Sequence, residues 1–174
     1  SAHPYEENLK QTVERVKICH SLGVTVDGEI GHVGLAATDD NAAEDRYTTT
    51  DEAREFYEAT GVDALAIAIG TAHGAYKSKP KLDFDRLTDL HTALPVPLVL
   101  HGGSGLSDDD FRRSIACGIS KVNIFTDLCL SGNAAMTDGL AAGEAYLTIR
   151  NRKVEYIKRA VMEKMSLFGS VGKA

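Results

Sequence analysis

The sequence predicts an α/β fold in which parallel strands alternate with helices. Two continuous apolar runs, residues 64–69 and 97–101, are separated by an amphipathic segment at residues 83–94. Continuous apolarity indicates strands that are buried on both faces, as parallel strands are. Polar or glycine-rich segments follow three of the predicted strands, at residues 70–74, 101–105 and 123–127. This alternation is typical of βα units.

The elements follow one another with short connections. We expect helices at residues 8–22, 50–60, 83–94 and 107–117, strands at residues 24–29, 64–69, 97–101 and 121–125, and a mainly helical tail from residue 127 to about residue 168. Gly23 and Gly61 stand where the first two helices should end, and Thr50 or Asp51 should cap the second. A closed barrel needs eight strands, so periodicity alone leaves open both a barrel and a doubly wound sheet.

The composition describes an ordinary globular protein with an acidic surface. The chain has 174 residues, 43% of them apolar, and a net charge of −6. This charge argues against nucleic acid or an anionic membrane as the main partner. No apolar run approaches the roughly 18 residues of a membrane span. The three cysteines form no C-x-x-C pair, which favours a reduced, cytoplasmic protein.

Two histidines lie at the ends of predicted strands. His73 and His101 each stand beside glycine, after a buried strand. Neutral imidazole is a common zinc ligand, and catalytic zinc sites often have three protein ligands and one open position. The alternative is a pair of structural histidines bonded to backbone carbonyls. His3, His20, His32 and His91 have no comparable setting and are interpreted as structural.

The segment His101-Gly102-Gly103-Ser104-Gly105 resembles an anion cradle. Successive backbone N–H groups in a glycine-rich turn can bind phosphate, and the Ser104 hydroxyl can add a donor. A helix that begins near Ser107 would favour negative charge at its start. Asn123 and Thr126, after the next strand, are donors for the same anion. The alternative is a tight βα turn that requires glycine for its shape alone.

Glu29 ends the first predicted strand, between Gly28 and Ile30. Its carboxylate could bind a cation or hold a metal-ligating histidine. A solvated or ion-paired carboxylate at the end of a strand is the alternative. Lys77, four residues after His73, could contact phosphate as a point charge, or belong to a solvated loop with Lys79 and Lys81.

Together these motifs resemble the class II fructose- and tagatose-bisphosphate aldolases. The matching stretches are Pro4–Asn8, Gly28–Gly31, Tyr47–Thr48, Glu52–Ala53, Thr60–Ala66, Ile69–Gly74, Pro80–Phe84, Leu98–Gly105 and Lys121–Ile124. They cover nearly all of residues 1–127 in order, whereas the tail matches only as helical. The two histidine motifs are the most specific part of the resemblance.

The resemblance implies a (β/α)8 TIM barrel, of which residues 1–174 form the C-terminal portion with about four strands. It also implies Zn²⁺ on three histidines, two of which match His73 and His101, and a homodimer or homotetramer. Glu29 matches a carboxylate that can hold metal in a second, non-catalytic position, and a monovalent cation is a further expected ion. The positions that match phosphate contacts are Gly74, Gly102, Gly103, Ser104, Asn123 and Thr126.

Two parts of the family pattern differ here. The third zinc histidine and the acid/base aspartate share a His-x-Asp-His segment, which we expect before Ser1 because the chain starts about where the fourth strand ends. Family members also carry Gly-Gly-x-Glu-Asp in the loop after Glu29, where this chain has residues 34–40. Asp39 or Asp40 is the candidate for proton transfer there, although a shorter carboxylate at another position fits the role poorly.

The resemblance implies an enzyme that reversibly cleaves a ketose 1,6-bisphosphate to dihydroxyacetone phosphate and an aldehyde. Zinc would polarise the carbonyl and stabilise the enediolate. Two alternatives stand beside this expectation. One is a catalytically impaired homologue that binds sugar phosphate or serves as a subunit partner, and the other is a metal-independent barrel enzyme such as an isomerase.

Overall fold

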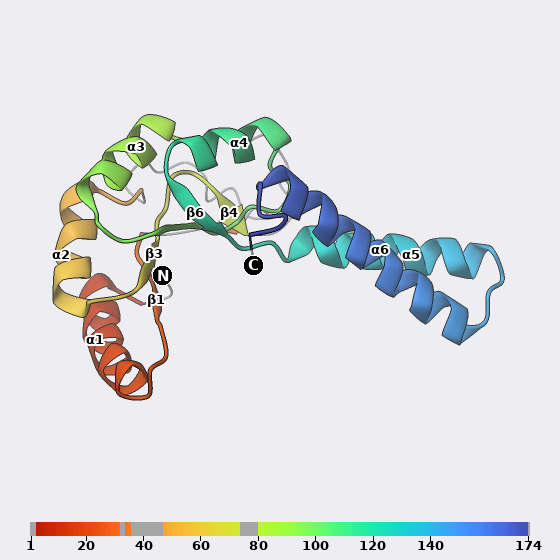
Figure 1. Cartoon of the computed structure of the whole chain (residues 1–174), viewed down its shortest axis with the longest axis horizontal. Helices are drawn as coiled ribbons and strands as arrows, with labels where there is room; N and C mark the ends of the chain where they lie inside the picture. The colour runs from red at the N-terminus through yellow and green to blue at the C-terminus, as the bar shows by residue number, and fades with distance from the viewer. Residues whose placement is uncertain (1–2, 32–33, 36–46, 74–79, 174) are drawn as a thin grey trace. The chain divides into compact units, whose positions relative to one another are not determined.

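The structure is a computed structural model that describes residues 3–31, 34–35, 47–73 and 80–173 (Figure 1). The chain divides into two compact units, Ser1–Asn123 and Ile124–Ala174. The first unit contains α1 (Tyr5–Ser21), β1 (Asp27–Glu29), β2 (Gly34–Leu35), α2 (Thr50–Thr60), β3 (Ala64–Ala66), β4 (Ala72–His73), α3 (Phe84–Ala93), β5 (Leu98–Leu100), α4 (Asp108–Ala116) and β6 (Ile119–Val122). The second unit contains α5 (Thr126–Ala141) and α6 (Tyr146–Leu167).

The main sheet has four parallel strands in the order β1-β3-β5-β6. This confirms the four predicted strands and their parallel direction. Each pair of neighbours is joined through a helix, as parallel strands require. The short strands β2 and β4 form a separate parallel pair, with Leu35 opposite His73. This second pair is not predicted from the sequence, because strands of two residues have no periodic pattern.

Strand boundaries differ from the predicted ones at several places. The first strand covers three residues rather than 24–29, and the last ends at Val122 rather than at residue 125. Backbone pairing fixes these limits, whereas apolar character continues beyond them. Residues 67–69 are buried although they lie outside β3.

One face of the sheet is covered by helices. Gly28 lies opposite Leu65, which lies opposite Leu98, so these three positions share a face. A Cβ atom on Gly28 would lie 2.9 Å from the Phe56 ring of α2 and 3.4 Å from Leu65 Cδ1. The Leu65, Leu98 and Phe56 side chains are fully buried there. Glycine at position 28 therefore allows α2 to pack directly on β1.

The opposite face carries small side chains. Ala64, Ala66 and Val99 form a buried apolar cluster on this face. Asp27 lies in register with Ala64, and Lys121 lies in register with Val99. Lys121 Nζ forms an ion pair with the Asp27 carboxylate, which joins the two outer strands of the sheet on the side of the small residues.

Side-chain caps fix where the helices begin. Thr49, not Thr50 or Asp51, caps α2, in a capping box with Glu52. Ser107 and Asp110 form the same arrangement at α4, and Asp83 caps α3 by accepting from the Arg86 N–H. Each cap satisfies a backbone donor that the helix itself leaves unpaired.

Thr48 joins two strand ends by hydrogen bonds. Its hydroxyl accepts from the Ala68 N–H (2.9 Å) and donates to the Ile30 carbonyl (3.3 Å), while its own N–H donates to the Ala68 carbonyl (3.0 Å). The side chain is almost fully buried. Thr48 therefore continues the pairing of β1 and β3 beyond their last paired residues.

The second unit is a helical hairpin. The predicted helical tail is confirmed, with a break at residues 142–145 between α5 and α6. Gly132, Ala135 and Gly139 are the buried residues of α5, and α6 buries none of its residues. Within the described part of the chain, no helix combines the length and apolarity needed to cross a membrane. Cys19, Cys117 and Cys129 are free.

Candidate metal and phosphate site

Polar side chains meet where three neighbouring strands end. Glu29 is the last residue of β1, His101 follows β5 directly, and Asn123 follows β6 directly. Because the strands are parallel, their carboxyl ends lie at one edge of the sheet. His101 Nδ1 lies 2.8 Å from Glu29 Oε2, and His101 Nε2 lies 3.0 Å from Asn123 Nδ2. The structure thus brings together three residues that are separate candidates in the sequence.

The two contacts of His101 fit one tautomer of the neutral imidazole, with the proton on Nδ1. With a proton on Nδ1, the ring donates to the Glu29 carboxylate, and Nε2 accepts from the Asn123 amide. The hydrogen bond from His101 is the main cause that lowers the pKa of Glu29 to about 2, against the effect of burial. Glu29 is therefore a carboxylate at neutral pH and can hold the imidazole in this tautomer.

This arrangement fits a zinc-ligating histidine. Such histidines commonly donate their other ring N–H to a carboxylate, which fixes the tautomer and the ring orientation. His101 offers Nε2 as the ligand atom, and its side chain is only 18% exposed. Among the residues that the structure describes, no three His, Cys, Asp or Glu side chains gather closely enough to hold a metal ion by themselves.

The second predicted ligand is described only in its backbone. His73 ends β4, paired with Leu35 of β2. Its side chain lies outside the described part of the structure, so its joint role with His101 stays a prediction. Gly74, Lys77, Asp39 and Asp40 also lie outside the described residues.

The glycine-rich loop after β5 has the backbone shape of a tight turn. Gly102 and Gly105 have positive φ angles of 65° and 87°, which favour glycine. Gly103 and Ser104 are buried in the loop. The positive φ angles explain two of the glycines by conformation alone. The phosphate contacts of Gly102, Gly103 and Ser104 stay a prediction.

The start of α4 does not support the expected attraction for an anion. Asp108, Asp109 and Asp110 occupy the first turn of α4, and the Asp110 carboxylate accepts from the Ser107 hydroxyl at 2.6 Å. These negative charges already compensate the helix dipole. Any phosphate in this region therefore depends on the loop and on neighbouring donors rather than on the N-terminus of α4. Thr126 is the first residue of α5, in the second unit, and its contact with phosphate stays a prediction.

Asn8 contacts the site through the backbone of Glu29. Asn8 Nδ2 donates to the Glu29 carbonyl oxygen (2.8 Å), and the Thr12 hydroxyl donates to Asn8 Oδ1 (3.4 Å). No role is predicted for Asn8 from the sequence, although it lies in one of the stretches that match the family. The spacing along α1 is the one feature of the sequence that could indicate a role for Asn8. Asn8 and Thr12 precede Val16 at intervals of four residues and therefore lie on the buried face of the helix.

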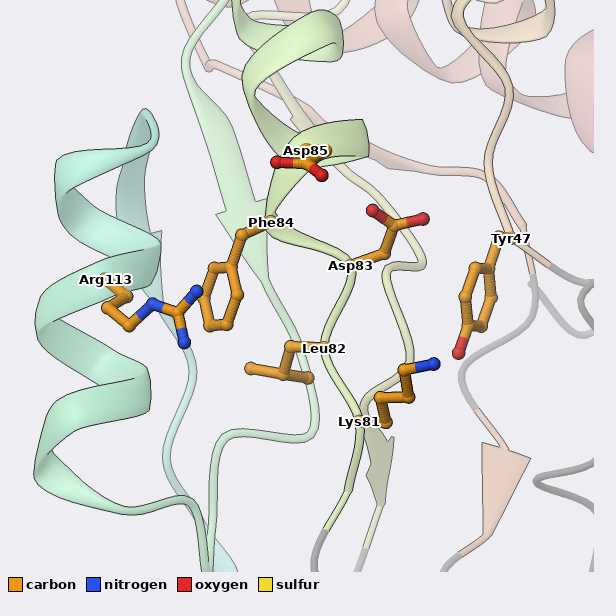
Figure 2. Close-up of a pocket in the computed structure, with 7 residues that line it drawn as sticks. All are labelled: Tyr47, Lys81, Leu82, Asp83, Phe84, Asp85 and Arg113. Atoms are coloured by element: carbon orange, nitrogen blue, oxygen red, sulfur yellow. The ribbon is translucent and has the colours of Figure 1, made fainter.

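A separate pocket of about 360 Å³ lies beside the start of α3. Its lining residues are Tyr47, Lys81, Leu82, Asp83, Phe84, Asp85 and Arg113, and none of the predicted site residues is among them (Figure 2). The Arg113 guanidinium stacks on the Phe84 ring, 3.9 Å from its centroid. A Cβ atom on Gly70 would lie 2.7 Å from the Tyr47 hydroxyl, so glycine there allows the tyrosine to approach the backbone.

Known proteins share both the sequence and the fold. The sequence matches the family described as "Fructose-bisphosphate aldolase class-II" over residues 1–173. It is 43% identical to a protein of Escherichia coli (strain K12) described as "Uncharacterized protein YdjI", over 100% of this chain and 62% of that protein.

Three solved structures are similar to this chain. The YdjI aldolase of Escherichia coli K12 has a TM-score of 0.87 and 40% identity, over 100% of this chain and 60% of that one. A putative fructose-1,6-biphosphate aldolase from Coccidioides immitis has a TM-score of 0.85 and 29% identity, over 98% and 61%. The fructose-bisphosphate aldolase of Campylobacter jejuni, at 23% identity and a TM-score of 0.78 over 100% and 60%, shows the fold alone.

Parallel βα units with polar groups at the carboxyl ends of the strands define an α/β barrel protein, here in part. The chain belongs to the class II fructose-bisphosphate aldolase family. It spans about three fifths of the length of the relatives that it matches. The family is one of lyases that act on phosphorylated sugars, generally with zinc. This confirms both the resemblance and the predicted fold class.

Proposed function

We propose that the complete protein is a zinc-dependent aldolase that reversibly cleaves a ketose 1,6-bisphosphate, of fructose or tagatose type, to dihydroxyacetone phosphate and an aldehyde. Given that the chain belongs to the aldolase family, one observation supports this proposal. The Glu29 carboxylate is hydrogen-bonded to Nδ1 of His101, and Nε2 of the same ring faces the Asn123 amide. The comparisons do not favour the alternative of an impaired homologue. Residues 1–174 would then be the C-terminal portion of one barrel domain, in a cytoplasmic protein.

The proposed roles of the residues near the metal follow from the chemistry of their side chains. His101 would hold the metal through Nε2, with His73 and a histidine outside residues 1–174 as the other ligands. Zinc, when bound, supplies a Lewis acid that polarises the ketose carbonyl and stabilises the enediolate. Glu29 keeps Nδ1 of His101 protonated, which leaves the Nε2 lone pair for the metal. In the second role proposed for it, Glu29 holds metal or a monovalent cation in a non-catalytic position.

Substrate phosphate would be held by backbone N–H groups and by side-chain donors. Asn123 donates to His101 Nε2 in this structure. Once that lone pair is engaged by a ligand, both Nδ2–H groups of Asn123 are available for phosphate oxygens. The other proposed donors are Gly74, Gly102, Gly103, Ser104 and Thr126. Asp39 or Asp40 is proposed to transfer a proton.

Zinc content and retro-aldol activity of the complete protein test this proposal. The His101→Ala and His73→Ala variants should lose bound zinc and at least about 100-fold in kcat/KM, since each removes a ligand atom. His3→Ala is the matched control, because His3 is an exposed histidine paired with Glu7. Retention of both zinc and activity by either ligand variant would contradict the proposal. Sugar-phosphate binding without turnover in the wild-type protein would identify an impaired homologue instead.

We also propose that the protein forms a homodimer or homotetramer through α5 and α6. All but three of the exposed large apolar side chains among the described residues belong to the second unit, including Leu130, Leu140 and Leu147. Many exposed apolar side chains on one unit favour an interface at that unit. Light scattering on the complete protein should show a multiple of the protomer mass. Leu147→Glu should shift the protein towards the monomer, whereas a monomeric wild-type protein would contradict the proposal.

A further inference from the structure

A line of hydrogen bonds runs from α1 to the candidate metal site. Thr12 donates to Asn8, Asn8 donates to the backbone carbonyl of Glu29, and the Glu29 carboxylate accepts from His101. His101 in turn accepts from Asn123, whose backbone N–H donates to the Leu100 carbonyl (3.1 Å). The line therefore connects α1 with the ends of β1, β5 and β6 (Figure 1 labels α1, β1 and β6).

One peptide plane in this line is held from both sides. Asn8 Nδ2 binds the carbonyl oxygen of Glu29 at 2.8 Å, and the N–H of Ile30, in the same peptide group, donates to the Ala66 carbonyl at 3.1 Å. A trans peptide directs these two groups in opposite directions. Because the plane follows Glu29 directly, its orientation constrains the ψ angle of Glu29 and therefore the direction of the Cα–Cβ bond that carries the carboxylate.

The Asn8 amide is itself held in place. Thr12 lies one turn further along α1, is only 7% exposed, and directs its hydroxyl at Asn8 Oδ1. A carbonyl oxygen that faces a hydroxyl donor leaves the Nδ2 side of the amide facing Glu29. The side chain is therefore oriented as a donor to strand β1.

We propose that Asn8 is a positioning residue for the metal site, acting on His101 through the backbone and carboxylate of Glu29. This inference rests on the proposed function, because it gives the Glu29–His101 pair a metal to orient. Asn8 does not touch the metal or the substrate in this role. Its loss should weaken and distort metal binding even though every ligand atom remains.

Two variants of the complete protein test the inference. Asn8→Asp keeps the size of the side chain but places an acceptor against the Glu29 carbonyl, and Asn8→Ala removes the contact without adding charge. Both should lower zinc affinity, measured by competition with a chelator, by about tenfold, the lower end of the effect of outer-shell partners. Both should also change the visible absorption bands of the cobalt-substituted protein, which report ligand geometry.

Two control variants separate this role from general packing of α1. Gln11→Ala removes a carboxamide whose hydrogen bonds, to Glu7 and Arg15, stay on the surface of α1, and it should alter neither readout. Val16→Ala removes a buried apolar contact of the same helix and should lower the Tm of the metal-free protein. Its zinc affinity and cobalt spectrum should stay those of the wild-type protein.

The outcomes distinguish this inference from the proposed function. A wild-type protein that binds no zinc overturns both. If the wild-type protein binds zinc and both Asn8 variants retain its affinity and cobalt spectrum, the inference alone is overturned. It is equally overturned if Val16→Ala changes zinc affinity and the cobalt spectrum as much as the Asn8 variants do, because the effect then comes from helix packing.

Discussion

The two units of the chain bury very different side chains. Residues 1–123 enclose large apolar groups between the sheet and its helices, and Phe56, Leu65 and Phe111 are fully buried there. In residues 124–174, the buried residues of α5 are two glycines and an alanine, and α6 has none. The first unit therefore has a core of large apolar side chains, whereas none of the large apolar side chains described in the second unit is fully buried.

The hairpin is held instead by close approach and by polar contacts. A Cβ on Gly132 would lie 3.3 Å from Ile157 of α6, so the two helix backbones lie near each other. Arg152 makes a two-pronged ion pair with Glu144, and the Tyr156 hydroxyl donates to Asp138 (2.8 Å). Solvent-exposed pairs such as Tyr156–Asp138 contribute little to stability, and the Arg152–Glu144 pair is only part-buried. The difference suggests that the second unit depends on a further apolar contact, as the proposed oligomer would supply.

The largest expected effect compares one leucine from each unit. Leu65→Ala should lower the free energy of unfolding by about 2–5 kcal/mol, because it leaves a cavity at a fully buried position. Leu140→Ala should change it by less than about 0.5 kcal/mol in the dissociated protein, since this side chain is 68% exposed. Urea denaturation at low protein concentration measures both. Equal decreases in the free energy of unfolding would show that Leu140 is buried within the monomer, which would contradict the difference between the two units.

A smaller effect is expected at the polar contacts within the first unit. Thr48→Val keeps the shape of the side chain but leaves the buried Ala68 N–H without its acceptor. The free energy of unfolding should fall by about 1–3 kcal/mol. Thr88→Val is the matched control, because the Thr88 hydroxyl is exposed and bonds only to the Phe84 carbonyl of its own helix. If the Thr48 variant were as stable as the control variant, the hydroxyl of Thr48 would not contribute to the free energy of unfolding.

Two glycines of the hairpin should respond in opposite directions. A Cβ at position 139 would lie 2.8 Å from Ile149 Cγ1, so Gly139→Ala should destabilise the hairpin by about 1 kcal/mol. At position 132 the nearest atom is the flexible end of Ile157, and Gly132→Ala should stabilise α5 by up to about 1 kcal/mol through helix propensity. Thermal unfolding followed by circular dichroism compares them. The same sign for both would contradict close packing at position 139.

The smallest effect concerns pH. The hydrogen bond from His20, followed by that from the Val26 N–H, lowers the pKa of the Asp63 carboxyl below its usual value. The stabilisation by Asp63 is therefore present above the ordinary carboxyl pKa and is lost as the pH falls through the lowered value. Asp63→Asn should be less stable than the wild type at neutral pH, with a difference that vanishes in acid. Urea denaturation at neutral and at acid pH measures this difference, and a difference that stays the same in acid would contradict the prediction.

Much of the fold could be predicted from the sequence because burial leaves a pattern in it. The apolar runs at residues 64–69 and 97–101 identify parallel strands, and Gly61 marks the end of α2 by its left-handed conformation, with φ of 66°. Thr49 as the cap of α2 could not be separated from Thr50 by residue type, since both threonines can cap. The pair formed by β2 and β4 also escaped prediction, because its strands are too short for periodicity.

The sequence by itself determined the class of the fold, the family, and the residues at the strand ends, since each depends on residue types at short spacing. Only the tertiary structure decided how those residues meet. The contact of Glu29 with His101 joins positions 72 residues apart in the sequence. The parallel strand order β1-β3-β5 brings the two strand ends to the same edge of the sheet. The contact from Asn8 to Glu29 likewise depends on how α1 packs against β1, which no local pattern specifies.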